Sequence, residues 1–190
     1  AYSSVAQAGF ILAPLGVVSS SDADSASKIL SAVVLYLLVY TVVNIGAFAV
    51  IIAVSRRTRS GEISSWGGLF GYAPGLAVSM AVFLFALGGI PPVAGWFAKF
   101  QLFTAVISPG TTAAYVLAAI MAVNTVVSLA YYLNVMRTMF MDDAPVGDLS
   151  PIRTPVPLLA AVGITAVAAL VLGFLPGLFL DLADGATFAL

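Results

Sequence analysis

The chain has 190 residues, of which 62% are hydrophobic and 8% are charged, and its net charge is −1. Soluble domains carry roughly 25% charged residues, so this composition indicates an integral membrane protein. The small net charge and the scattered basic residues argue against a nucleic-acid partner. Cys and His are both absent from the sequence, which excludes disulfides, Cys/His metal sites and haem ligation by either residue type.

Five membrane elements are predicted from the apolar stretches, since about 20 residues are needed to cross a bilayer as a helix. In chain order they cover about 4–18, 29–54, 74–107, 113–140 and 156–175. The last element extends to 180 if the apolar residues that follow 175 are included. The first is short for a full crossing. Together they predict an all-α fold, a polytopic transmembrane helix bundle that forms a single transmembrane domain over residues 1–190.

Basic residues set the predicted orientation, because cytoplasmic loops of membrane proteins are enriched in Lys and Arg. The arginines fall in two of the loops: Arg56, Arg57, Arg59, Arg137 and Arg153. If the element over 74–107 crosses the membrane once, both loops lie on the same side. We therefore expect residues 55–65 and 137–153 to face the cytoplasm.

The third element is too long for one straight helix and too short for two crossings. At about 1.5 Å per residue it would span roughly 50 Å, against a hydrocarbon core of about 30 Å. Two glycines and two prolines lie near its middle: Gly88, Gly89, Pro91 and Pro92. Because proline removes helix hydrogen bonds and glycine loosens the turn, we predict a discontinuous helix with its break at these residues. Broken helices of this kind recur at the ion sites of transporters.

Lys99 is the only formally charged residue between Glu62 and Arg137. A cation at bilayer depth costs about 2.5 kcal/mol or more, so its presence requires a reason. The functional interpretation is a proton relay, because lysine changes its protonation state readily when it is buried. The alternative is a lysine that snorkels to the interface, but the next turn, at 108–110, begins about nine residues further along. The neighbouring helix break favours the relay.

Polar side chains within the apolar stretches are candidates for holding a chain of water molecules. Gln101 and Asn124 lie near mid-depth of their elements, and Gln7 is the corresponding residue of the first element. The alternative for each is an ordinary hydrogen bond between helices, which contributes about 1 kcal/mol or less. The aromatic pair Tyr131 and Tyr132, shortly before an arginine, is typical of an interfacial belt.

Three segments carry a resemblance to a known family: AYSSVAQAGF at 1–10, YTVVNIGAFAVI at 40–51 and GGIPPVAGWFAKFQLF at 88–103. They resemble the antiporter-like membrane subunits of respiratory complex I, and most of all the subunit N branch of bacterial NADH–quinone oxidoreductases. In that branch the third segment holds a broken helix with a lysine of the central proton-relay axis, which implies this role for Lys99. The sister subunit M typically carries a glutamate there. Many relatives have His where this chain has Gln7.

The resemblance implies that the chain is the C-terminal third or more of a longer antiporter-like subunit. It implies a proton-translocating membrane subunit of NADH–quinone oxidoreductase that performs no redox chemistry itself. No cofactor is expected on this chain, since NADH, FMN, Fe–S clusters and quinone would bind other subunits of the complex. The expected partners are the other membrane subunits, including sister antiporter-like subunits, and the lipid bilayer of the bacterial inner (plasma) membrane, which the chain would cross several times.

Three other functions remain open from the sequence. A similar motif occurs in subunits of multi-subunit sodium/proton antiporters. A purely structural membrane subunit would also fit the composition, and it predicts that Lys99 is dispensable once assembly is preserved. A stand-alone secondary transporter predicts ion transport by the purified chain alone.

Overall fold

The computed structural model describes residues 2–144, 152, 154–175 and 177, and within these residues all regular structure is helical. In this part of the chain the α-helices and the two 3-10 helices (η) are α1 (Tyr2–Leu12), η1 (Ala13–Ser20), α2 (Ala23–Thr58), η2 (Ile63–Trp66), α3 (Leu69–Tyr72), α4 (Pro74–Gly88), α5 (Ala94–Ile107), α6 (Thr112–Met141) and α7 (Val156–Phe174). The predicted all-α fold class is therefore confirmed.

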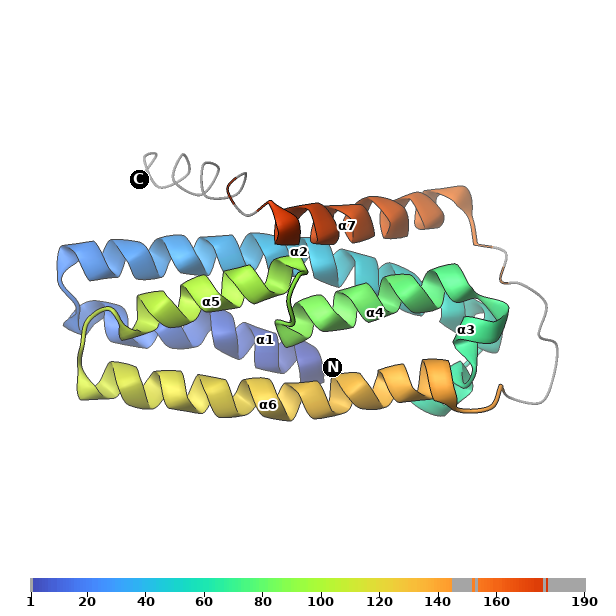
Figure 1. Ribbon diagram of the computed structural model, residues 1–190, viewed down its shortest axis with the longest axis horizontal. Coiled ribbons are helices and arrows are strands. Elements are labelled where there is room, and N and C mark those ends of the chain that lie inside the picture. The colour runs from blue at the N-terminus through green and yellow to red at the C-terminus, as the bar shows by residue number, and fades with distance from the viewer. Residues whose placement is uncertain (1, 145–151, 153, 176, 178–190) are drawn as a thin grey trace.

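The long helices lie side by side along the longest axis of the molecule, and α4 and α5 follow one another between α2 and α6 (Figure 1). Within the described residues, four stretches are long and apolar enough to cross a membrane, judged by length and composition: Tyr2–Ser19, Ala23–Thr58, Thr112–Met141 and Val156–Phe174. Helices α4 and α5 are apolar but shorter, with 15 and 14 residues. The composition is thus that of a polytopic helical membrane protein.

The first two elements differ from their predicted bounds. The first is not one helix over 4–18: α1 ends at Leu12 and a 3-10 segment follows, because Pro14 has no N–H to donate to the carbonyl of Phe10. The second is longer than predicted and covers 36 residues. Polar residues extend it at its start, where Lys28 lies 2.5 Å from Asp24 one turn earlier.

The third predicted element is two helices. Helix α4 ends at Gly88, Gly89 adopts a left-handed conformation (φ 78°), and α5 begins at Ala94. The amide of Gly89 donates to the carbonyl of Ala86, and the next amide donates to Phe85, as is typical of a left-handed helix cap. The peptide bond between Pro91 and Pro92 is cis. The interpretation of α4 and α5 as two halves of one membrane crossing stays a prediction.

Two glycines allow close packing around this connection. A Cβ at Gly95 would lie 1.7 Å from the carbonyl oxygen of Ala86, so α5 begins directly against the last turn of α4. A Cβ at Gly173 would lie 2.0 Å from the carbonyl oxygen of Pro92, so α7 packs against the connection itself. Side chains larger than hydrogen are excluded at both positions, and the connection is enclosed by protein on these sides.

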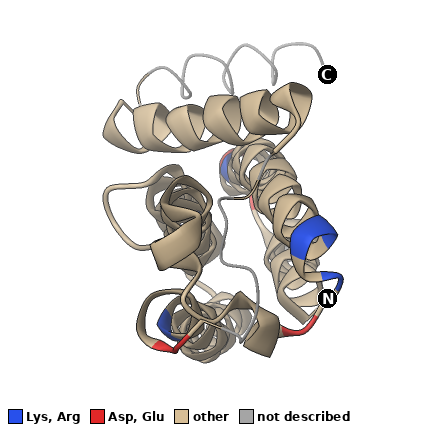
Figure 2. Ribbon diagram, turned by 90° about the vertical axis from the view of Figure 1, so that its right-hand side faces the viewer, with Lys and Arg blue, Asp and Glu red and all other residues tan. Residues whose placement is uncertain are grey.

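Charged residues are few, and most of the ribbon is uncharged when viewed from one end of the bundle (Figure 2). Helices α2 and α6 both end at the right-hand end of the molecule in Figure 1. The last turn of α2 carries Arg56 and Arg57, and Arg137 lies four residues before the end of α6. These basic residues therefore lie at the same end of the bundle, as the predicted orientation requires.

Candidate functional site

The break between α4 and α5 leaves one main-chain acceptor without its helical partner. In a continuous helix the carbonyl of Leu87 would accept a hydrogen bond from residue 91, but Pro91 has no N–H. Two side chains donate to the Leu87 carbonyl oxygen in place of this missing N–H. Lys99 Nζ donates to Leu87 O at 2.8 Å, and Gln7 Nε2 donates to the same oxygen at 3.1 Å. The carbonyl freed by the proline is thus the point where α5 and α1 meet α4.

Lys99 is buried, with 4% of its surface exposed. Its side chain runs back toward the break: a Cβ at Gly89 would lie 2.8 Å from Lys99 Cδ, so the glycine makes room for the lysine stem. Its ammonium nitrogen lies 4.7 Å from the centroid of the Phe10 ring. The ammonium therefore points toward the end of α4 and into protein, and not along α5 toward the turn at 108–110, which is the direction considered for a snorkelling lysine.

Gln7 is completely buried and connects the Lys99 site to two tyrosines. Its Nε2 donates to the hydroxyl of Tyr132 at 3.0 Å, and the hydroxyl of Tyr36 donates to Gln7 Oε1. The hydroxyls of Tyr132 and Ser3 are 2.6 Å apart and share a further hydrogen bond. A connected set of hydrogen bonds therefore runs from Lys99 through the Leu87 carbonyl, Gln7 and Tyr132 to Ser3.

The sequence interpretation missed both tyrosines. Tyr132 is 3% exposed and is not part of an interfacial belt, and Tyr36 is also 3% exposed. The only signal in the sequence is that each hydroxyl lies within an apolar stretch, where a buried polar atom needs a hydrogen-bond partner.

The other two candidate polar residues make local contacts. Thr104 Oγ1 donates to the backbone carbonyl of Gln101 at 2.9 Å and lies 3.5 Å from its Oε1. The backbone carbonyl of Asn124 accepts from Ser128 Oγ at 2.8 Å. Among the three residues predicted to hold water, Gln7 is the one that the described structure joins to Lys99 through a shared acceptor.

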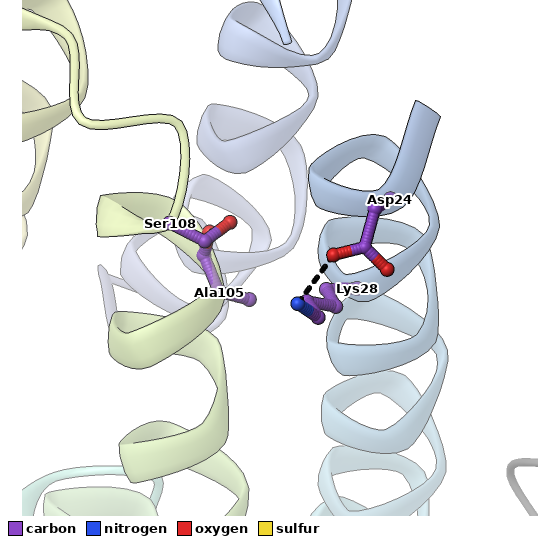
Figure 3. Close-up of polar contacts among 4 residues, drawn as sticks. All are labelled: Asp24, Lys28, Ala105 and Ser108. Atoms are coloured by element: carbon purple, nitrogen blue, oxygen red, sulfur yellow. Dashed lines mark hydrogen bonds and ion pairs between the residues drawn. The ribbon is translucent and has the colours of Figure 1, made fainter. Parts of the chain in front are cut away.

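The second lysine of the chain is in a different environment. Lys28 is exposed and pairs with Asp24 on the same face of α2, near the turn where Ser108 Oγ donates to the carbonyl of Ala105 (Figure 3).

Within the described residues no group of three or more His, Cys, Asp or Glu side chains could hold a metal ion. The buried Trp96 Nε1, close to the break, has no hydrogen-bond partner in the described part of the chain.

The fold is that of a helical membrane protein in which a buried lysine of α5 packs against the connection between two short apolar helices, α4 and α5. Residues 1–128 match the family described as NADH:quinone oxidoreductase/Mrp antiporter, transmembrane. The chain belongs to this family.

Its relatives include subunits of one enzyme complex. The chain is 39% identical over 187 residues to NADH-quinone oxidoreductase subunit N of Geobacillus kaustophilus, a match that covers 96% of this chain and 35% of that protein. It is 42% identical over 177 residues to the subunit N of an Anaeromyxobacter species, covering 91% of this chain and 33% of that protein. The predicted resemblance is confirmed, and the chain spans about a third of the length of these relatives.

Two solved structures share the fold. A chain of respiratory complex I from Thermus thermophilus with bound aureothin aligns with a TM-score of 0.66 and 26% identity, covering 94% of this chain and 44% of that one. A chain of the Mrp complex from a Dietzia species aligns with a TM-score of 0.72 at 21% identity, covering 97% of this chain and 46% of that one. Both structures are of multi-subunit complexes.

Proposed function

We propose that this chain is part of a membrane subunit that translocates protons in NADH–quinone oxidoreductase, with Lys99 as a proton relay. The observation that carries the proposal is the placement of the Lys99 ammonium, which is buried and donates to the carbonyl released by the helix break. The names of the curated relatives support the choice of complex.

In this proposal the break provides a fixed hydrogen-bond acceptor, the Leu87 carbonyl, for an amine that gains and loses a proton. The Leu87 carbonyl stabilises the protonated amine without pairing it to a permanent anion, so the proton can leave when a neighbouring charge changes. Gln7 holds the acceptor in place through its own hydrogen bond. Gln101 and Asn124 would hold water further along the path. Gly88, Gly89, Pro91 and Pro92 would keep the break open.

The driving energy would come from elsewhere in the complex. NADH, FMN, Fe–S clusters and quinone would bind other subunits, and this chain would perform no redox chemistry. Its neighbours would be the other membrane subunits, including sister antiporter-like subunits. The chain would lie in the inner (plasma) membrane with its arginine-bearing loops in the cytoplasm, and α4 and α5 would form one interrupted crossing.

A subunit of a multi-subunit sodium/proton antiporter is the second candidate. The description of the matched family, NADH:quinone oxidoreductase/Mrp antiporter, supports it, because this description includes both kinds of protein. The two candidates differ in their source of energy: the first requires NADH oxidation, and the second exchanges one ion gradient for another. Genes for NADH dehydrogenase modules beside this one would favour the first.

The test is Lys99→Met, compared with Lys28→Met as the matched control. Methionine keeps much of the length of the side chain and removes the titrating group in both cases. Each variant is incorporated into the full complex, assembly is checked, and the number of protons pumped per NADH is measured in proteoliposomes. Lys99→Met is expected to lower this ratio, whereas the exposed Lys28→Met is expected to leave it unchanged. An assembled Lys99→Met complex with the wild-type ratio would support a purely structural role.

A further inference from the structure

The ring of Phe10 lies beside the Lys99 ammonium, and the proposed relay assigns no role to this ring. The Phe10 side chain is 1% exposed, and the centroid of its ring lies 4.7 Å from Lys99 Nζ. Two aromatic neighbours hold the ring: Tyr36 of α2 at a centroid distance of 6.2 Å and Phe103 of α5 at 6.5 Å. Phe10 is thus fixed by two helices next to the ammonium.

A ring in this position acts differently on the two protonation states of the lysine. The face of an aromatic ring attracts a cation within about 6 Å, and the attraction is larger when the pair is removed from water. A neutral amine gains little from the same contact. We propose that Phe10 is a positioning residue that stabilises the protonated form of Lys99 and keeps its ammonium at the Leu87 carbonyl.

The other ionisable groups around Lys99 do not supply this stabilisation. Tyr36 of α2 and Tyr132 of α6 are neutral phenols at ordinary pH and bond to Gln7. The sequences of η1, α4 and α7 contain no Asp, Glu, Lys, Arg, His or Tyr, and Lys99 is the only such residue of α5. Within the described residues that pack on Lys99, the Phe10 ring and the Leu87 carbonyl are the groups that favour its charge.

The proposal rests on the proposed function, because it assumes that Lys99 titrates during pumping. Fluorinated phenylalanines at position 10 weaken the negative face of the ring step by step while hardly changing its size. The same series at Phe103 is the matched control, because this ring belongs to the same aromatic cluster. The readout is the number of protons pumped per NADH by the intact complex as a function of pH. The Lys99→Met complex is measured in parallel.

At position 10 the high-pH limb of the profile is expected to move to lower pH with each added fluorine, because the protonated lysine is then lost at a lower pH. Complete loss of the ring attraction corresponds to a shift of about 0.4–1.5 pH units. The series at Phe103 is expected to leave the limb in place. Identical profiles throughout the position-10 series, or equal shifts in both series, would overturn the proposal while Lys99→Met still lowers pumping. Wild-type pumping by Lys99→Met would instead overturn the proposed function.

Discussion

Replacing Gly95 with alanine tests the contact between α4 and α5 that brings the acceptor to Lys99. The new methyl group would lie 1.7 Å from the Ala86 carbonyl oxygen and 2.5 Å from the carbonyl carbon. Non-bonded carbon and oxygen atoms approach to about 3.3 Å, so the two helices must separate by roughly 1.5 Å. The obstacle is backbone, and it cannot rotate away as a side chain could.

Overpacking of this kind destabilises a protein by about 1–3 kcal/mol, and a backbone obstacle places Gly95→Ala near the upper end. The displacement also moves the adjacent Leu87, whose carbonyl oxygen lies 2.8 Å from Lys99 Nζ. A shift of roughly 1.5 Å is enough to break this hydrogen bond. We therefore expect Gly95→Ala to lower both the stability of the complex and the number of protons pumped per NADH.

Gly163→Ala is the matched control, because no heavy atom of the described residues lies within 4 Å of a Cβ at this position of α7. It should be neutral, or stabilising by up to about 1 kcal/mol through its higher helix propensity. The assay compares the thermal disassembly midpoint of the purified complexes and the amount of complex assembled in membranes. Equal midpoints and equal pumping for Gly95→Ala and wild type would refute the close approach of α4 and α5.

The remaining predictions concern the network, the packing of α7 and the orientation. Gln7→Leu should lower pumping and destabilise the complex by about 1–3 kcal/mol, because the buried hydroxyls of Tyr36 and Tyr132 lose their hydrogen-bond partner, whereas Gln7→His should retain more activity. Equal pumping by wild type and Gln7→Leu would contradict this prediction. Gly173→Ala should lower the thermal midpoint, since its Cβ would lie 2.0 Å from the Pro92 carbonyl oxygen; an unchanged midpoint would show that α7 does not pack on the break. Cysteines introduced as Ser60→Cys and Asp142→Cys should resist an impermeant thiol reagent added outside cells, whereas Ser27→Cys, at the opposite end of α2, should react. The reverse labelling pattern would show that the predicted orientation is wrong.

The helices and the place of the lysine were predictable because their causes are local. A proline lacks its N–H in any context, so the sequence alone locates the end of α4 close to Pro91. The same reasoning, applied to Pro14, would have located the end of α1, which the predicted element over 4–18 overlooked. An isolated lysine in an apolar segment is equally visible without a structure.

The partners of the lysine were not predictable, because they depend on tertiary packing. Gln7 and Leu87 are 80 positions apart, and Gln7 and Tyr132 are 125 positions apart. The sequence around Tyr132 is equally compatible with a tyrosine at a membrane interface, since an arginine follows five residues later. The contact of Phe10 with Lys99 is hidden for the same reason.

The most direct measurement of the central claim is proton pumping by Lys99→Arg in the assembled complex. Arginine keeps the positive charge but remains protonated at every working pH, so it separates the presence of a cation from its ability to titrate. The account predicts that the complex assembles and oxidises NADH but pumps fewer protons per NADH than wild type. A Lys99→Arg complex that pumps with the wild-type ratio would contradict the claim that Lys99 is a proton relay.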